Sequence, residues 1–504
     1  MPSDVIGRQA EFEADWEGKG AVKRSDLPQT LGSSLMMRIM LLALLVSGTF
    51  LTANANDPPP NFVVIFTDDQ GFADVGVFGS EQFGFQTPHI DRMATEGMKF
   101  TDFYAVSSVC TPSRAGLLTG CYPPRTGAIR VLFPPSDVGL SPEEVTIADL
   151  LKEQGYATAA IGKWHLGHHP HFLPTRQGFD YYWGIPYSND MWIDPRAPLS
   201  EEVLLHDGIT REWIRDAQPD QRRRVNDVPL MINEEVVEYP IDQRYLTRRT
   251  TEQAIAFMEQ HRDQPFFLYV PHVMPHIPLF ATDEFTGSSE RGLYGDVIQE
   301  LDWSVGRILE AIAELGLDER TLVVFTTDNG PWNLSGGRGG HADPLRGYKF
   351  SVFEGGMRVP TVMRWPGKIP AGTIQTEIGA TIDLLPTLAH LAGCELPEDR
   401  VIDGRNIWPL MSGEPGARSP HPAFYYYAAN SNRLAAVREG HWKYHAPHGD
   451  QPEQLYNLAI DLGETRNLAA VYTEVAARLR QQMEEFDDDL KVNARPIGRL
   501  PGSE

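Results

Sequence analysis

Cysteine is scarce in this sequence. Among 504 residues the chain has three, Cys110, Cys121 and Cys394. An odd number leaves at least one thiol unpaired, so a disulfide framework does not hold this protein together. The fold must depend on a hydrophobic core instead, and apolar residues make up 41% of the sequence, a value typical of globular proteins.

Basic residues are few relative to acidic ones. The chain has 44 lysines and arginines against 68 aspartates and glutamates, which gives a formal net charge of −24. No segment is rich in lysine or arginine, so the sequence argues against a nucleic-acid partner. Because the negative field would repel an anionic substrate, any anion-binding site must be locally cationic.

No apolar stretch reaches the about 20 residues that a membrane span needs. Residues 36–55 instead have the pattern of a secretory signal peptide. Its parts are the charged start Met36-Met37-Arg38, the apolar run Ile39 to Val46 and the small-residue cleavage site Ala53-Asn54-Ala55. We expect export to the periplasm or the extracellular space and no stable membrane span, with an uncleaved anchor as the alternative. We expect the polar residues 1–35 to be a non-native N-terminal extension, with translation starting at Met36 or Met37.

Four apolar runs recur along the chain, and each ends in polar residues. Such runs are typical of strands buried on both faces, and helical patterns lie between them, at 147–154, 293–315 and 381–391. Strands that alternate with helices predict an α/β fold with a large mixed, mostly parallel central sheet and helices on both faces. The predicted strands are Phe62–Phe66, Ala157–Ile161, Phe266–Val270 and Leu322–Phe325.

The C-terminal part of the sequence has a different pattern. Residues 411–416 are typical of a linker. Short strand patterns follow at 423–427, 434–437 and 442–445, before a charged helix at 472–486. We therefore predict a main domain at 61–410 and a small C-terminal α+β domain with an antiparallel sheet at 411–504.

Oxygen ligands follow two of the predicted strands. Asp68 and Asp69 follow the first strand, and Asp328 and Asn329 follow the fourth. Ligands of α/β sheets bind at the carboxyl ends of the strands, so we expect these side chains to meet there. Converging carboxylates would repel one another without a cation, so the set predicts a divalent metal such as Ca²⁺ or Mg²⁺. The alternative is that each pair belongs to an ordinary turn.

Cys110 opens a segment, Cys-Thr-Pro-Ser-Arg-Ala-Gly-Leu-Leu-Thr-Gly, that predicts an anion site. Thr111 is typical of a helix N-cap, and Pro112 is typical of the first helical position. The helix dipole and Arg114 would both favour negative charge beside Cys110. The alternative is that Cys110 is a small buried cysteine of the core.

Cys121 is a competing candidate, because a proline and an arginine follow it at the same spacing. Pro123-Pro124 after it favours a turn over a helix, so Cys110 is the better candidate. A plain catalytic thiol would be unusual in an exported protein, where it tends to oxidise.

Cationic side chains occur at the ends of the same strands. Lys163 and His165 follow the second strand, His276 follows the third, and Lys349 lies in a glycine-containing loop. Fixed cations beside a dication suit an oxyanion ester such as sulfate or phosphate. His272 lies near His276, and we expect it to be either a supporting residue or an ordinary strand-end histidine.

Two segments resemble the signature stretches of formylglycine-dependent sulfatases, the arylsulfatase A-like branch of the alkaline phosphatase superfamily. They are Cys110 to Gly120 and the segment Gly-Tyr-Ala-Thr-Ala-Ala-Ile-Gly-Lys-Trp-His that ends at His165. The resemblance extends from about Asn61 into the C-terminal domain and implies an alkaline phosphatase-like fold with a catalytic domain at 61–410. It also implies that a maturation enzyme oxidises Cys110 to formylglycine (3-oxoalanine), which would explain an exported reactive cysteine.

The resemblance further implies the metal site and the attack on sulfur. One Ca²⁺ ion would be bound by Asp68, Asp69, Asp328, Asn329 and the modified Cys110. A hydroxyl of the aldehyde hydrate would attack sulfur, with Asp328 as the base. Arg114 and Lys163 would stabilise the hydrate and the charge of the sulfate.

The remaining residues would act on the substrate and the second hydroxyl. By the same resemblance, His276 and Lys349 would bind sulfate and protonate the leaving alcohol. His165 would help to remove the proton of the second hydroxyl, and Ser188 would contact the substrate through its own hydroxyl.

The predicted function is therefore hydrolysis of sulfate esters on a sulfated small molecule or glycan, with aryl or carbohydrate sulfates as substrates. One alternative is a phosphonate monoester or phosphodiester hydrolase of the same superfamily. Another is a catalytically silent secreted protein that binds Ca²⁺ and glycans. The insertion from about Tyr187 to Thr247 should line the substrate entrance, because loops of this kind carry specificity.

Overall fold

The computed structural model describes residues 58–216, 225–334 and 338–502, which belong to one compact unit beginning at Pro58. The predicted signal peptide and extension lie outside the described residues. Within that part of the chain, no helix is both long and apolar enough to cross a membrane.

A large central sheet contains eleven strands of the described residues. Its order, from one edge to the other, is β13 (Thr373–Gln375), β2 (Met98–Phe100), β12 (Thr361–Arg364), β11 (Thr321–Thr327), β1 (Asn61–Thr67), β10 (Phe266–Pro271), β5 (Ala157–Lys163), β6 (Tyr181–Ile185), β8 (Leu230–Ile232), β9 (Glu235–Tyr239) and β7 (Leu199–Leu205).

The middle of this sheet is parallel. Strands β11, β1, β10, β5 and β6 pair in parallel, with Val64 of β1 opposite Val324 of β11 and Tyr269 of β10. On either side, β12 and β8 pair antiparallel with their inner neighbours. The four strands that the apolar runs predict are β1, β5, β10 and β11, so the prediction of a mixed, mostly parallel sheet is confirmed.

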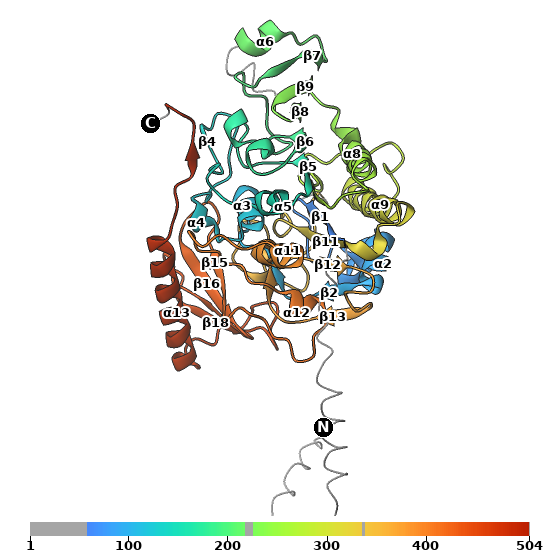
Figure 1. The fold of residues 1–504 in the computed structure, drawn as a ribbon. Coiled ribbons are helices and arrows are strands. Elements are labelled where there is room, and N and C mark those ends of the chain that lie inside the picture. Colours follow the sequence, from blue (N-terminus) through green and yellow to red (C-terminus); the bar gives the residue numbers. More distant parts are fainter. Residues whose placement is uncertain (1–57, 217–224, 335–337, 503–504) are drawn as a thin grey trace, which may run out of the picture. The chain divides into compact units, whose positions relative to one another are not determined.

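Helices cover both faces of the sheet, because both faces are apolar. In β1, Val64 contributes to one buried cluster and its neighbours Val63 and Ile65 contribute to the other. Helices α3 (Cys110–Thr119), α5 (Ile147–Glu153) and α11 (Leu384–Ala392) lie on one face. Helices α2 (Pro88–Glu96), α8 (Leu246–Gln260) and α9 (Leu293–Glu314) lie on the other, as Figure 1 shows. The helix predicted at 381–391 is α11 preceded by a 3₁₀ turn at Thr381–Asp383.

The insertion after β6 extends the sheet. It forms β7, β8, β9 and the short helix α6 (Arg211–Asp216), none of which the sequence analysis assigned. Its first residues, including Ser188, lie at the carboxyl edge of the parallel strands, because β6 ends there at Ile185.

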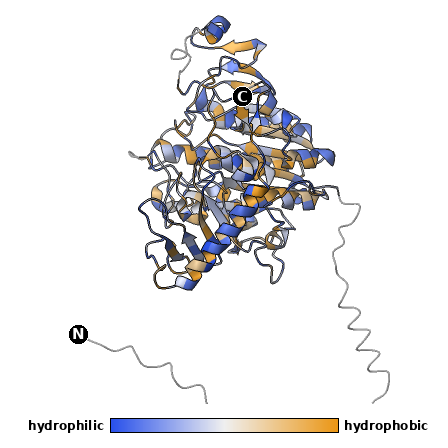
Figure 2. Cartoon of the chain, turned by 90° about the vertical axis from the view of Figure 1, so that its left-hand side faces the viewer, coloured by the Kyte–Doolittle hydropathy of each residue, from blue (hydrophilic) through white to orange (hydrophobic). Residues whose placement is uncertain are grey.

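A second, antiparallel sheet lies near the C-terminus, as predicted. It consists of β15 (Phe424–Tyr427), β16 (Leu434–Glu439), β17 (Trp442–His445) and β18 (Gln454–Asn457). Helix α13 (Thr473–Val492) packs on this sheet and continues six residues beyond the predicted end, and Figure 2 shows its outward face as mostly hydrophilic. One buried cluster joins Tyr104 and Tyr122 of the main part to Phe424 and Tyr426. The domain boundary expected near residue 411 stays a prediction.

Candidate active site

The carboxyl ends of the central parallel strands bring most of the predicted site residues together. Asp68 and Asp69 follow β1, Asp328 and Asn329 follow β11, Lys163 ends β5, and His276 follows β10. All six are at least nine-tenths buried. The charged side chains among them must therefore be stabilised by other groups of the site instead of by water.

Helix α3 begins at Cys110, at the same edge of the sheet. The N-cap is Val109, in extended conformation, so the expectation that Thr111 caps the helix is wrong. Thr111 lies in the first turn, where its hydroxyl donates to the backbone carbonyl of His165 at 2.9 Å. That bond ties the start of α3 to the segment that follows β5, and so it joins the two signature stretches.

Cys121 takes no part in this site. It is buried, and its Sγ lies 3.3 Å from the carbonyl oxygen of Thr119. The turn expected at Pro123-Pro124 is in fact a single helical turn, α4 (Pro123–Thr126), because proline is tolerated in the first turn of a helix. Arg125 pairs with Asp403 at 2.7 Å and not with the acids of the site.

The four side chains that we predict to bind a metal lie close together. The side-chain amide of Asn329 donates to Asp69 Oδ1 at 2.7 Å, and the backbone N–H of Asp69 donates to Asp328 Oδ1 at 3.1 Å. Asp69 holds this position with φ of +64°, a conformation that is uncommon among non-glycine residues. Asp68, Asp69 and His276 each place one possible ligand atom within 4.8 Å of the others.

Two oxygens of this cluster are buried with no hydrogen-bond partner among the described residues. They are Asp68 Oδ1 and Asn329 Oδ1. A buried polar atom without a partner costs free energy, so a native site normally supplies a ligand for it. The donors are carboxylate and amide oxygens, which Ca²⁺ and Mg²⁺ prefer. The residues therefore fit a divalent cation.

Three cations surround the carboxylates. Arg114 Nη2 lies 2.8 Å from Asp328 Oδ2 and 3.5 Å from Asp68 Oδ2. The ammonium of Lys163 contacts Asp68, and Lys349 Nζ lies 2.7 Å from Asp69 Oδ2. The three cations thus balance the three carboxylates, and a bound dication would make the site cationic within a chain of strongly negative net charge.

The same charges shift the pKa values of the acids in opposite directions. Burial alone would raise the pKa of Asp68, but Lys163, His276 and Arg114 hold it well below its ordinary value. Burial and the neighbouring Asp68 raise the pKa of Asp328 to about 7. Burial also raises the pKa of the Cys110 thiol, which disfavours a thiolate there.

Burial favours the uncharged form of the two site histidines. Burial is the main cause that lowers the pKa of His165 and of His276 well below the ordinary value. His165 Nε2 lies 2.9 Å from the carbonyl oxygen of Leu132, and its Nδ1 has no partner among the residues described. His276 Nδ1 lies 2.6 Å from the carbonyl oxygen of Ile277, which orients the ring.

Ser188 lies between these groups. Its hydroxyl oxygen is 3.2 Å from Lys163 Nζ and 3.4 Å from the ring nitrogens of His276. His272 is separate from the site, because its Nε2 lies 3.1 Å from Ser304 Oγ on α9 and burial lowers its pKa to about 4. We interpret it as a structural histidine.

A cavity of about 310 Å³ opens above the site. Its walls include predicted residues and others that the sequence analysis missed. The lining residues are Cys110, Arg130, Val131, Phe133, His165, Ser188, Asp190, Met191, His276, Trp332, Lys349, Phe350 and Asn430. Trp332 could have been found, because it lies three residues after Asn329. Asn430 could not, because it lies in the β15–β16 turn of the C-terminal sheet.

Comparison with known proteins gives the family. The family model "Sulfatase" matches residues 60–394, and "N-sulphoglucosamine sulphohydrolase, C-terminal" matches residues 348–489. The chain is 38% identical to arylsulfatase A of Homo sapiens over 459 residues, covering 84% of this chain and 87% of the relative. It is 36% identical to N-acetylgalactosamine-6-sulfatase of Canis lupus familiaris over 447 residues, covering 86% and 80%.

A solved structure agrees with these relatives. The crystal structure of Ps i-CgsB in complex with k-i-k-neocarrahexaose superposes with a TM-score of 0.76 and 30% identity, over 87% of this chain and 95% of that one. Fold, site and relatives thus lead to one conclusion: the chain belongs to the sulfatase family of the alkaline phosphatase superfamily and is a sulfuric ester hydrolase.

Proposed function

We propose that this protein hydrolyses sulfate esters of carbohydrates through a formylglycine made from Cys110, with one Ca²⁺ ion. The observation that carries the proposal is the position of Cys110. It begins a helix at the strand edge, in a cavity that also contains His165, His276 and Lys349. The relatives and the solved structure named above support a sulfated glycan substrate, although an aryl sulfate also fits the family.

The metal would be held by the oxygens of Asp68, Asp69, Asp328 and Asn329 together with the modified residue 110. A dication there would neutralise the converging carboxylates and polarise the oxygens bound to it. The metal ion would compete with Lys163 and Lys349 for the carboxylates of Asp68 and Asp69. The two ion pairs described above would therefore be weaker when the metal is bound. Their ammonium groups would then be available to a sulfate.

A formylglycine hydrate at residue 110 would supply a hydroxyl as the nucleophile. Asp328 is the base for that hydroxyl, and Arg114 fixes its carboxylate through the contact at 2.8 Å. Lys163 and Arg114 stabilise the charge that develops on the sulfate, because fixed cations in a buried site act strongly on it.

Three other residues of the site would act on the leaving alcohol. His276 and Lys349 bind the sulfate and protonate the leaving oxygen, and Ser188 donates to the substrate from between Lys163 and His276. His165 would accept the proton of the second hydroxyl at Nδ1, which has no hydrogen-bond partner among the described residues. Removal of that proton would allow the sulfate to leave residue 110.

Two requirements lie outside the catalytic centre. A formylglycine-generating enzyme must act on Cys110, and a signal peptide at 36–55 would export the chain to the periplasm or beyond. The proposal includes both. An exported thiol tends to oxidise, whereas a formylglycine made from Cys110 would not depend on a free thiol.

The test has two parts, using protein produced together with a formylglycine-generating enzyme. Peptide mass spectrometry should show loss of H₂S and gain of one oxygen at Cys110, and an intact thiol at Cys121. Rates on 4-nitrophenyl sulfate should exceed those on bis(4-nitrophenyl) phosphate. Preference for the phosphodiester would support the alternative hydrolase, and a sulfated glycan bound without any turnover would support the silent binding protein.

A further inference from the structure

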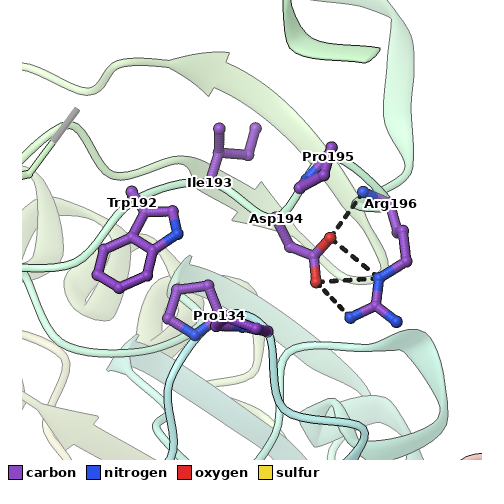
Figure 3. A pocket seen from close by; sticks show the side chains of 7 residues that line it. Pro134, Trp192, Ile193, Asp194, Pro195 and Arg196 are labelled. Atoms are coloured by element: carbon purple, nitrogen blue, oxygen red, sulfur yellow. Dashed lines mark hydrogen bonds and ion pairs between the residues drawn. The ribbon is translucent and has the colours of Figure 1, made fainter. Parts of the chain in front are cut away.

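The active-site cavity is the place where the ring that carries the sulfate would bind. Its volume of about 310 Å³ lies at the lower end of the usual range for small-molecule sites, and Cys110 is in its wall. A second cavity, of about 230 Å³, has none of the predicted catalytic residues among its described lining residues. The charges there are paired with each other, because Arg196 Nη2 donates to Asp194 Oδ2 at 2.8 Å, as Figure 3 shows.

Phe350 lines the active-site cavity with an apolar ring that is only half-buried. The residue is 48% exposed. A half-exposed phenyl ring lacks much of the hydrophobic stabilisation that full burial gives. Its described ring contacts are a T-shaped one with Trp332, with centroids 6.0 Å apart, and one with Lys349 Nζ, 5.8 Å from the ring centroid. Phe350 therefore presents apolar surface in the cavity that contains Cys110.

The backbone of Phe350 is in the left-handed region, with φ of +71°. This conformation is an outlier for a bulky side chain. Two hydrogen bonds hold the chain there, from the N–H of Phe350 to the carbonyl of Ser108 at 3.0 Å and from the N–H of Lys349 to the carbonyl of Pro331 at 2.9 Å. Both involve backbone groups alone, so glycine at position 350 would allow them without the steric cost of a side chain. The geometry of the loop therefore does not explain the phenyl ring.

Exposure and backbone strain together indicate that the ring of Phe350 binds a ligand. Strained backbone conformations cluster at active sites and ligand-binding positions. Phe350 directly follows Lys349, whose Nζ lies 2.7 Å from Asp69 Oδ2 in the site. Phe133, which is 50% exposed, adds a second apolar ring to the wall of the same cavity. Aromatic side chains of this kind pack against the apolar face of a sugar ring or stack on an aryl ring.

We propose that Phe350 binds the ring that carries the sulfate group and thereby selects cyclic leaving alcohols such as sugars. The inference rests on the proposed function and makes it more specific, because it names a residue that holds the leaving group. Phe350 is a specificity-determining residue: it contacts the ring, whereas the cationic side chains of the site bind the sulfate.

The test measures hydrolysis of 4-nitrophenyl sulfate by the matured wild type and by three variants. Phe350→Ala and Phe350→Gly both remove the ring, so KM should rise about three- to tenfold in each at nearly unchanged kcat. Phe350→Tyr keeps an aromatic face and should keep KM within about twofold of the wild type. Inorganic sulfate has no ring, so its inhibition constant should change less than about twofold in all three variants.

Thermal unfolding separates the effect of the ring from that of the backbone. Phe350→Gly should melt about 1–3 °C above Phe350→Ala, because glycine adopts φ of +71° without the steric conflict that a Cβ causes. The two variants should nevertheless show the same rise in KM. Tyr348→Ala controls for disturbance of the loop, since Tyr348 is exposed and is not among the described residues that line the cavity. It should leave KM unchanged.

Four results in an active wild type would overturn the assignment and leave the proposed function standing. One is an unchanged KM in Phe350→Ala. A second is a KM that Phe350→Gly restores and Phe350→Ala does not, because the backbone and not the ring would then control binding. The others are an equal weakening of inorganic sulfate and a Phe350→Gly variant that melts below Phe350→Ala. A wild type with formylglycine and no activity on any sulfate ester would refute the proposed function itself.

Discussion

At the scale of single residues, the centre of the site contains buried oxygens that accept no hydrogen bond from the described residues. Asp68 Oδ1 and Asn329 Oδ1 are buried beside three carboxylates and three cations, and no described group donates to them. The positive φ of Asp69 holds its carboxylate in the same cluster. A bound dication would account for the two unpartnered oxygens and for the convergence of the carboxylates, and the prediction for Asp68 below depends on it.

The first prediction concerns removal of the metal. Ca²⁺ should raise the melting temperature of the chelator-treated protein by about 2–5 °C, since a ligand stabilises the folded state that binds it. Differential scanning fluorimetry with and without Ca²⁺ measures this shift. Asp68→Asn should abolish it, whereas Asp137→Asn, outside the cluster, should retain it. If Ca²⁺ still raised the melting temperature of Asp68→Asn by the same amount, the ion would bind elsewhere in the protein.

The second prediction separates the two cysteines. Cys110→Ala should lower kcat for 4-nitrophenyl sulfate by about 10³-fold or more, because the attacking group is lost. Cys121→Ala should keep activity near that of the wild type, since Cys121 contacts backbone carbonyls and not the site. Steady-state kinetics on both variants measures the difference, and a fully active Cys110→Ala would contradict the account.

The third prediction concerns Ser188. Its hydroxyl lies between Lys163 and His276, so Ser188→Ala should remove one hydrogen bond to the substrate. We expect kcat/KM for 4-nitrophenyl sulfate to fall about three- to tenfold, the usual size of one such bond. Ser188→Thr, which keeps the hydroxyl, serves as the control. No change in Ser188→Ala would mean that this side chain does not contact the substrate.

At the scale of elements, close packing of β5 against its neighbours positions Lys163. Gly162 has φ of +137°, and a Cβ there would lie 2.1 Å from the carbonyl oxygen of Pro271 on β10. Gly184 on β6 is equally restricted, because its Cβ would lie 1.7 Å from the carbonyl oxygen of Gly162. The strands can approach this closely only because neither glycine has a side chain.

The fourth prediction follows from this packing. Gly162→Ala should lower the free energy of unfolding by about 3 kcal/mol or more, since the methyl group meets backbone that cannot move away easily. Gly463→Ala is the control, because its Cβ would be 3.4 Å or more from its neighbours. Urea unfolding of both variants measures the change. Equal stability of the two would show that β5 and β10 can separate without cost.

The sequence predicted the elements whose pattern is local. Strands such as Phe62–Phe66 were found because both of their faces are buried and apolar. Helix α9 was found because its buried apolar residues recur at helical spacing. The N-cap of α3 was mispredicted, because Thr111 bonds to His165, which is distant in sequence. Asn430 reaches the cavity only through the packing of two sheets, and no local pattern encodes such a contact.

At the scale of the whole molecule, a buried charge network joins the C-terminal sheet to the main part of the chain. Glu354, in the short helix α10 (Glu354–Met357), accepts hydrogen bonds from Lys443 Nζ at 2.8 Å, from Tyr104 at 2.6 Å and from Tyr426 at 2.8 Å. Burial alone would raise the pKa of Glu354, but Lys443 and Arg438 hold it far below its usual range.

The fifth prediction tests this network. Lys443→Met should lower the free energy of unfolding by about 3–5 kcal/mol at neutral pH, because it leaves a buried carboxylate without its partner. Lys491→Met, which removes an exposed ion pair, should change it by about 0.5 kcal/mol or less. Denaturant unfolding at pH 7 measures the free energy of unfolding of both variants. Equal losses in the two variants would show that the buried network does not stabilise the fold more than an exposed ion pair does.

The same network has a pH dependence of known sign. A carboxyl group with a lowered pKa in the folded state stabilises the fold above the unfolded pKa of about 4.3, and this contribution is lost as the pH falls below it. The stability difference between the wild type and Lys443→Met should therefore narrow on acidification. A difference that stays constant from pH 7 to pH 3 would show that Glu354 does not contribute through its charge.

A crystal structure of the matured, active protein grown with Ca²⁺ tests the central claim most directly. The account predicts density without sulfur at position 110 and one ion within bonding distance of Asp68 Oδ1 and Asn329 Oδ1. An unmodified thiol and no ion at the carboxyl ends of β1 and β11, in crystals of protein that hydrolyses sulfate esters, would contradict it.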